Sequence, residues 1–359
     1  MHQILYVGWV GFGNLGDELL WNVFDDLSRR YFDKNKVQIT PSLPYVDVNR
    51  LDSYDLVVLG GGSIIAPYYL GILRKALEQG KKVAIWGSGI DWQTKEFLRC
   101  LLSGDKFPYQ PFYDGFVELL SEIVHHSTYT GVRGPLTYDT MKRLGIDMEK
   151  VEICGDPGLL VPVTEQEYPH SEELINWDDE KIIGLNWGTT FNDIYGHNES
   201  VVEEQLVEAV HHFIKQGYKI FLYDVWQEDV QHSTRLYEKI TDKSKVYRAK
   251  KLYNQYELVQ KLRHCCFTVN FKLHANVLSV VAGVPFIALG YRFKIFDFVQ
   301  SIGLPNIAVP TDSPNLTDEI CTLSEYVTSH RAEITELFNT YSNHYHVKLE
   351  RPFQHTFFL

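Results

Sequence analysis

The sequence lacks the patterns that mark several specialised classes of protein. Its 359 residues include five cysteines without CxxC spacing, and no apolar run approaches the roughly 18 residues of a membrane span. No signal peptide is recognisable, because the apolar start is interrupted by Gly8 and Gly11 and no basic region precedes it. We therefore expect a cytoplasmic protein with reduced thiols, and contact with the inner face of the membrane stays open.

Positive charge is also scarce. The formal net charge of −12 argues against nucleic-acid binding, which depends on a positive field. It does not exclude an anionic small substrate, because the lining of a cleft sets the local field. The adjacent pairs His125–His126 and His211–His212 cannot both face one ion from a helix, so we assign no metal site.

Repeats and low-complexity segments are absent, and the chain instead alternates apolar runs with segments of helical periodicity. This alternation predicts parallel α/β sheets. It stops in an acidic stretch at 165–180, which we interpret as a linker, and then resumes. We predict two Rossmann-like domains facing a cleft, at 1–165 and 180–316, and a C-terminal helix and tail at 317–359. The helix should cover about 317–343; whether it returns to the first domain and what oligomer forms stay open.

The first glycine-rich turn, Gly11, Gly13 and Gly16, matches a dinucleotide-binding fingerprint in spacing. We reject that function because no acidic residue follows the second expected strand to hold a ribose. Asp17 and Glu18 also place carboxylates where a pyrophosphate would dock.

The same turn can still approach a different ligand through Gly13, Asn14 and Gly16. Asp17 has two interpretations: it stabilises the helix dipole, or it acts as a general base that orients a hydroxyl.

Further glycine loops follow later strands. Gly61, Gly62 and Ser63 lie in the run 60–63 after DLVVL, and Gly87 begins a Gly-Ser-Gly loop after KVAIW. Because glycines have no side chains, such loops at one sheet edge would form a floor under a substrate. A tight strand-to-helix turn is the alternative.

Cationic side chains occur where strands end and helices begin. Arg133 could offer a bidentate fork to phosphate or carboxylate, or form an ordinary surface ion pair. Lys272 and His274 open an apolar helix, and Lys294 follows the next strand. The alternatives are a hydrogen-bonded core histidine for His274 and a solvated surface lysine for Lys294. The proximity of these residues in the sequence favours an anion site. Five aromatic residues could offer stacking faces, with core packing as the alternative: Trp9, Tyr68, Tyr69, Trp187 and Trp226.

Six motifs in this order resemble the polysaccharide pyruvyltransferase family, from Gly8 to about Phe298. They are GNLGDELL, LGGGS, GSG, VRGPLT, GDPGLL and KLHANVLSVVAGVPFIALGYRFK. The resemblance implies a glycosyltransferase-B-like arrangement and transfer of pyruvate from phosphoenolpyruvate to a sugar as a ketal. It assigns anion binding to Arg133 and Lys294 and a functional histidine to His274. The family usually has arginine where this chain has Lys272, which keeps the charge but loses the fork.

The resemblance also implies the partners: phosphoenolpyruvate as co-substrate without another cofactor, and a lipid- or nucleotide-linked saccharide from a cell-surface polysaccharide pathway. His274 would protonate the donor, and Asp17 would accept a hydroxyl proton. The alternatives are a nucleotide-sugar glycosyltransferase, for which we see no clear ribose-binding glutamate, and a non-catalytic carbohydrate-binding relative.

Overall fold

Each of two units of the chain contains one parallel sheet. The computed structural model describes residues 1–107, 112–163, 181–355 and 357–359, so the expected linker at 165–180 lies outside the described residues. Unit 1 comprises Met1–Leu160, Arg292–Ser301 and Ser342–Leu359, and unit 2 comprises Val161–Tyr291 and Ile302–Tyr341.

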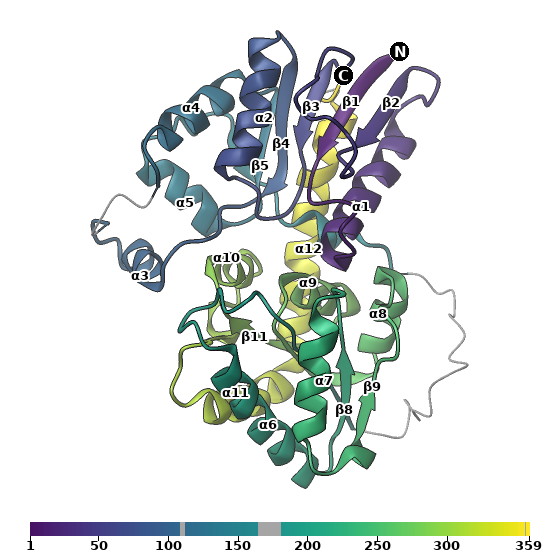
Figure 1. Ribbon diagram of the computed structural model, residues 1–359, viewed down its shortest axis with the longest axis vertical. Helices are drawn as coiled ribbons and strands as arrows, with labels where there is room; N and C mark the ends of the chain where they lie inside the picture. The colour runs from purple at the N-terminus through teal and green to yellow at the C-terminus, as the bar shows by residue number, and fades with distance from the viewer. Residues whose placement is uncertain (108–111, 164–180, 356) are drawn as a thin grey trace. The chain divides into compact units, whose positions relative to one another are not determined.

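The sheet of unit 1 has six parallel strands in the described part of the chain (Figure 1). Its spatial order is β2 (Val37–Pro41), β1 (His2–Val7), β3 (Leu56–Leu59), β4 (Lys82–Ser88), β5 (Tyr129–Val132) and β6 (Val151–Ile153). Every residue of β3 and β5 is buried, as expected for a parallel sheet that is covered on both faces.

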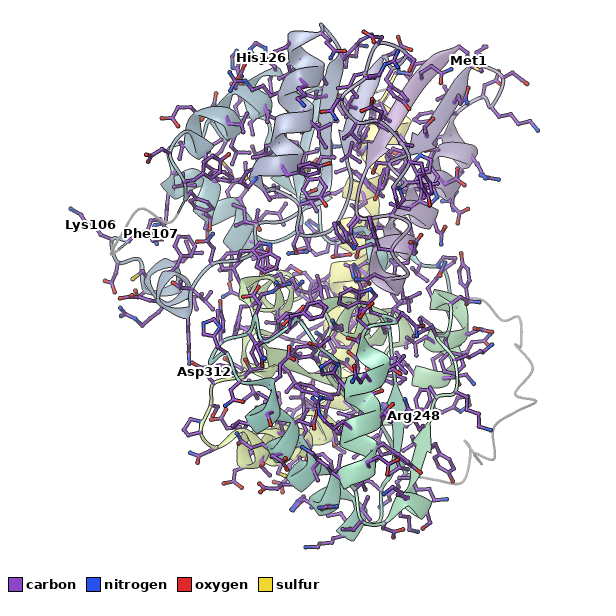
Figure 2. The ribbon with its side chains drawn as sticks, viewed as in Figure 1. Met1, Lys106, Phe107, His126, Arg248 and Asp312 are labelled. Carbon is purple, nitrogen blue, oxygen red and sulfur yellow. The ribbon has the colours of Figure 1, made fainter. Side chains whose placement is uncertain are left out.

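The helices of unit 1 pack on this sheet or on one another, with side chains between them (Figure 2). They are α1 (Leu15–Tyr31), α2 (Pro67–Glu78), α3 (Lys95–Ser103), α4 (Phe116–His126), α5 (Pro135–Arg143), the 3-10 turn η1 (Pro157–Leu160) and α10 (Phe293–Ser301). The final part of α12 (Arg331–Gln354) also belongs to unit 1, where Phe353 packs against Phe24 and Trp86.

Unit 2 repeats this architecture with a different strand order. Its six described strands are all parallel and run β12 (Ala308–Pro310), β11 (Phe286–Gly290), β10 (Cys265–Asn270), β7 (Ile182–Asn186), β8 (Lys219–Tyr223) and β9 (Val246–Arg248). The helices are α6 (Glu199–Lys215), α7 (Asp229–Lys239), α8 (Gln255–Leu262), α9 (Leu273–Ala282) and α11 (Leu316–Ser329), followed by the first part of α12.

The strand orders locate the edge where ligands bind. In each sheet the order reverses once, between β1 and β3 in unit 1 and between β7 and β10 in unit 2. Open α/β sheets bind ligands beyond the carboxyl ends of the strands at such switch points. Val7 pairs with Leu59, and Asn186 pairs with Asn270, so the loops after these strands leave from the same edge.

The end of the chain differs from the expected single helix at 317–343. The structure has two helices, α11 and α12, separated at His330, the C-cap residue of α11, whose N–H still donates to the carbonyl of Tyr326. Both halves have helical periodicity, so the sequence pattern gives no warning of the break.

Candidate functional site

The loop between β1 and α1 is shaped by its own polar side chains. Asn14 is the N-cap of α1, and its Oδ1 accepts a hydrogen bond from the N–H of Gly16 at 3.0 Å. Glu18 accepts one from the N–H of Gly11 at 2.7 Å. Asn14 and Gly16 therefore organise the start of the helix, while Gly13, at φ 66°, has open space around it.

Asp17 lies against the neighbouring loop after β3. A Cβ at Gly62 would be 3.6 Å from Asp17 Oδ1, and Gly62 itself has a left-handed φ of 105° that favours glycine. Burial and the nearby Asp17 carboxylate raise the pKa of Tyr69 to about 12. The switch point of unit 1 thus carries one carboxylate over a glycine loop.

Close packing explains one further glycine of the predicted floor, and an irregularity in strand pairing explains another. A Cβ at Gly61 would lie 3.0 Å from the Leu20 side chain. Gly87 has φ 73° and lies where the pairing of β4 with β5 shifts register between Trp86 and Ser88, which is the conformation of a bulge.

Arg133 is fully buried at the carboxyl end of β5. Its Nη1 donates to Ser63 Oγ at 3.2 Å, and its Nε lies 4.0 Å from Asp297 Oδ2. Nε and Nη2 find no hydrogen-bond acceptor among the described residues. A Cβ at Gly89 would lie 2.6 Å from Arg133 Nη2, so that glycine makes room for the guanidinium. Buried donors without acceptors are costly, and an anion would satisfy them.

Two more cations in unit 1 share the buried carboxylate of Asp91. Arg292 Nη2 lies 3.2 Å from Asp91 Oδ2, and Lys294 Nζ lies 3.5 Å from the same oxygen. The backbone N–H of Lys294 donates to Asp91 Oδ1 at 3.3 Å. The guanidinium of Arg292 also stacks on Trp92, 3.8 Å from the ring centroid.

Burial and mutual repulsion shape the ionisation of this group. Burial, together with the charges of Arg292 and Arg133, lowers the pKa of Lys294 to about 8, although Asp91 opposes the shift. Burial alone would raise the pKa of Asp91, but Arg292, Lys294 and Arg133 outweigh it and lower that pKa. Burial raises the pKa of Asp297 in spite of Arg133.

We call Arg133, Arg292, Lys294, Asp91 and Asp297 the unit 1 cation cluster. Three cations face two carboxylates, and burial raises the pKa of one of these, Asp297, so the five groups together have excess positive charge in a buried setting. Such a setting favours an anionic ligand, because screening by water is weak there.

Lys272 lies at the switch point of unit 2, as the N-cap residue of α9. Its ammonium is 3.0 Å from Asp229 Oδ1, donates to the carbonyl of Thr189 at 2.6 Å and lies 4.7 Å from the Trp226 ring centroid. Its backbone N–H donates to Asn186 Oδ1 at 2.9 Å. Lys272 therefore ties the loops after β7, β8 and β10 together.

His274 occupies the first turn of α9 and is only 8% exposed. Two buried oxygens of the same region, Asn276 Oδ1 and Asp229 Oδ2, accept no hydrogen bond from any described residue. Burial raises the pKa of Asp229 although Lys272 lies beside it. Buried polar atoms with unused hydrogen-bonding capacity therefore occur at the switch point of unit 2 as well.

The aromatic candidates divide into core and surface. Trp187 is fully buried and donates its Nε1–H to Glu203 at 3.1 Å, so it is a core residue. Trp9 and Tyr68 are 43% and 66% exposed. Trp226 is half-buried over Lys272, and its ring meets Phe191 edge-on.

The structure groups the predicted residues by unit. Arg133, Lys294 and Asp17 belong to unit 1, whereas Lys272 and His274 belong to unit 2, although Lys294 follows His274 closely in the sequence. Sequence reasoning missed the carboxylates that organise these cations, which are Asp91, Asp297 and Asp229. Of these, Asp297 had a weak signal, because it follows Lys294 by three positions on a helix.

In the part of the chain that the structure describes, no group of three or more His, Cys, Asp or Glu side chains could hold a metal ion. No described helix is both long and apolar enough to cross a bilayer.

Solved structures share this fold at low sequence identity. The chain matches MnaA with UDP from S. aureus at TM-score 0.66 and 10% identity, covering 99% of this chain and 96% of that one. It matches UDP-GlcNAc 2-epimerase from Neisseria meningitidis at TM-score 0.59 and 12% identity, covering 94% of each. Anabaena Alr3699/HepE, solved with UDP and glucose, gives TM-score 0.55 and 11% identity, covering 99% of each. The protein therefore has a glycosyltransferase-B-like fold, which confirms the predicted class.

The sequence match is more specific than the fold. The model of the family described as polysaccharide pyruvyl transferase matches residues 14–292, and the chain belongs to this family. The amylovoran biosynthesis protein AmsJ of Erwinia amylovora is 21% identical over 282 residues, covering 74% of this chain. The chain spans 63% of the length of AmsJ.

Proposed function

We propose that this protein transfers the pyruvyl group of phosphoenolpyruvate to two hydroxyls of a saccharide and forms a cyclic ketal. Family membership supports the reaction class. The observation that carries the proposal is the environment of Arg133. Two of its buried N–H donors have no acceptor among the described residues, and the side chain lies in a cluster with excess positive charge. Phosphoenolpyruvate has a phosphate and a carboxylate, which are the groups that an arginine fork binds best.

The reaction balances without a redox partner. A proton adds to the methylene carbon of the donor, and positive charge develops at its C2. One hydroxyl oxygen bonds to C2, the bond between C2 and the phosphate oxygen breaks, and a second hydroxyl oxygen bonds to C2. Of the two hydroxyl protons, one balances the proton taken up by carbon and the other leaves with inorganic phosphate.

Unit 1 supplies donor binding and one proton acceptor in this proposal. Arg133 and Lys294 bind the anionic groups of the donor, and Arg292 and Asp91 position Lys294. Asp17, at the end of α1 nearest the loop of Gly62, accepts a hydroxyl proton. Gly13 and Gly62 leave space for a ligand to approach the backbone.

The proposed proton donor is His274. His274 protonates the methylene carbon, since imidazole changes protonation near neutral pH. Lys272 adds positive charge at the same helix start, where the N–H groups of α9 also favour anions. The co-substrate is the source of the transferred group, and the proposal needs no further cofactor. The acceptor is a lipid- or nucleotide-linked saccharide of a cell-surface polysaccharide pathway in the cytoplasm.

Calorimetric titration with phosphoenolpyruvate, beside UDP, tests the proposal. Wild type should bind phosphoenolpyruvate. The variant Arg133→Lys should bind it about 10- to 100-fold more weakly, because losing charge-assisted hydrogen bonds costs about 1.5–3 kcal/mol. Arg143→Lys is the matched control, since Arg143 bonds the backbone carbonyls of Cys100 and Leu101 and stacks on Phe107.

The outcomes separate the alternatives. Equal loss of affinity in both variants would remove the specific role of Arg133. Binding of UDP but not of phosphoenolpyruvate would overturn the proposal and favour a nucleotide-sugar glycosyltransferase.

A further inference from the structure

Exposed aromatic side chains gather along one edge of the sheet of unit 1. They are Trp9, Phe12, Tyr45, Tyr68 and Trp92, which we call the aromatic row, and they are exposed by 43%, 43%, 98%, 66% and 61%. Each lies in the segment after the carboxyl end of a strand: Trp9 and Phe12 after β1, and the others after β2, β3 and β4. Large rings at a sheet edge that binds ligands are unlike apolar residues scattered singly over a surface.

The strand order makes these segments neighbours. The strands that precede them are adjacent in the order β2, β1, β3 and β4, with every pair parallel. Three strand spacings of about 4.8 Å give a width of about 15 Å. The row is therefore long enough to contact more than one ring of a ligand.

Local contacts hold the first half of the row in place. Trp9 stacks on Phe12 with 4.1 Å between ring centroids. A Cβ at Gly11 would lie 2.7 Å from Pro44 Cδ, so the Trp9 loop rests on the loop that carries Tyr45. Ser42 Oγ accepts from the N–H of Gly8 at 3.0 Å and ties the same two loops together.

The second half is also ordered by specific contacts. Tyr68 meets Tyr69 edge-on, with 5.1 Å between centroids. Trp92 has φ 63°, which a bulky residue adopts only when its surroundings enforce it, and Arg292 stacks on its ring. Arg292 connects the end of the row to the unit 1 cation cluster.

The chemistry of the row suits a sugar chain better than a membrane. A pyranose offers an apolar C–H face for stacking and a polar hydroxyl edge, which matches rings whose own segments of chain also carry the acidic residues Asp17, Glu18 and Asp47. Surfaces that bind anionic lipid combine aromatic residues with many lysines and arginines. In the first half of the row, between 8 and 18 and between 42 and 49, the charged residues are all acidic, and in the second half Arg292, which stacks on Trp92, is paired with Asp91.

We propose that the aromatic row binds the acceptor as an extended saccharide of several sugar units, stacked ring on ring along the sheet edge. The identification of this saccharide as the acceptor rests on the proposed function. The row gives specificity for chain length, because each further ring covered adds stacking contact.

Calorimetric titration of the full chain with neutral oligosaccharides of two, four and six units tests this proposal. The oligosaccharides form four series, built from glucose, galactose, mannose and N-acetylglucosamine. For at least one series, affinity should rise about tenfold or more from two to six units. Tyr45→Ala and Tyr68→Ala should each weaken hexasaccharide binding about tenfold. Both side chains are exposed, so the fold should persist. Tyr326→Ala, an exposed tyrosine on α11, is the matched control and should bind like wild type.

Phosphoenolpyruvate binding by the same preparations separates the two proposals. Three results would each overturn the row as a saccharide site: affinity that does not depend on chain length, no binding in any series, or unchanged binding by both variants. Binding to vesicles of phosphatidylcholine and phosphatidylglycerol that Tyr45→Ala abolishes would assign the row to a membrane instead. In each case retained phosphoenolpyruvate binding leaves the proposed function standing.

Discussion

The charge of Lys294 changes with pH just above neutrality. Its pKa, lowered to about 8 by burial and by Arg292, lies well below the 10.5 of a free lysine. Below pH 8 the ammonium is charged in both the folded and the unfolded chain. Between about pH 8 and 10.5 only the unfolded chain holds this proton, so the contribution of Lys294 to stability rises with pH in that window. Binding of an anion has the opposite dependence, because it needs the ammonium.

The affinity for phosphoenolpyruvate should fall above pH 8, by about tenfold at pH 9, because about a tenth of Lys294 is then protonated. Lys294→Arg should remove this dependence. Calorimetry in buffers of different ionisation enthalpy measures both the affinity and the protons taken up. A Lys294→Arg variant with the pH profile of wild type would show that another group controls binding.

The ammonium of Lys272 is held by a buried carboxylate, that of Asp229, and by the backbone carbonyl of Thr189. Asp229 accepts a hydrogen bond from the N–H of Thr189 at 3.1 Å and also forms the ion pair with Lys272. Removing the lysine would leave a buried carboxyl with a raised pKa and without its ammonium partner.

We predict that Lys272→Met lowers the free energy of unfolding by about 3 kcal/mol, and that adding Asp229→Asn recovers part of this loss. Urea denaturation of both variants and of Lys251→Met measures the effect. Lys251, whose partner Glu257 is 3.0 Å away, is exposed, so its loss should cost less than about 1 kcal/mol. Equal costs for the two lysines would mean that the buried pair contributes no more than a surface one.

At the scale of secondary structure, the start of α1 explains why a polar residue follows the glycines. Asn14 satisfies the N–H of Gly16, and Asp17 and Glu18 place negative charge in the first turn, where the helix dipole favours it. Asn14 has this role without any ligand.

Two substitutions of Asn14 distinguish a helix cap from a binding residue. Asn14→Ser should keep stability within a few tenths of a kcal/mol and retain phosphoenolpyruvate binding, whereas Asn14→Ala should cost about 1 kcal/mol. Thermal unfolding and calorimetry of both variants measure this. If Asn14→Ser unfolds like wild type yet loses binding or turnover, the side chain contacts a substrate.

Local sequence patterns predicted most elements, because each strand begins and ends with a change that the chain itself displays. Apolar runs such as 55–59 stop at glycines, and helices such as 135–143 begin at Pro135. The break at His330 was missed, since both sides of it are amphipathic. The cations at loop starts were also visible, but the carboxylates that hold them were not, because Asp91 meets Lys294 across 203 positions.

At the scale of the molecule, the alternation of strands and helices predicted two Rossmann-like domains, and the glycosyltransferase-B-like class is confirmed. The order of strands was not predictable, and with it the positions of the two switch points. The assignment of Arg292–Ser301 to unit 1 depends on long-range contacts, among them the bonds from the N–H groups of Leu136 and Thr137 to Asp297. No local pattern encodes such pairings.

Transfer of the carbon skeleton of phosphoenolpyruvate to a sugar tests the proposed reaction most directly. The protein is incubated with phosphoenolpyruvate labelled with ¹³C at C2 and with lipid-linked, nucleotide-linked and free oligosaccharides, and ¹³C and ³¹P spectra are recorded. We predict a ketal carbon signal and an equal amount of inorganic phosphate. In His274→Ala both should be lost while phosphoenolpyruvate still binds, and a surface change, His125→Ala, should have no effect. Labelled pyruvate without a ketal, or full turnover by His274→Ala, would contradict the account.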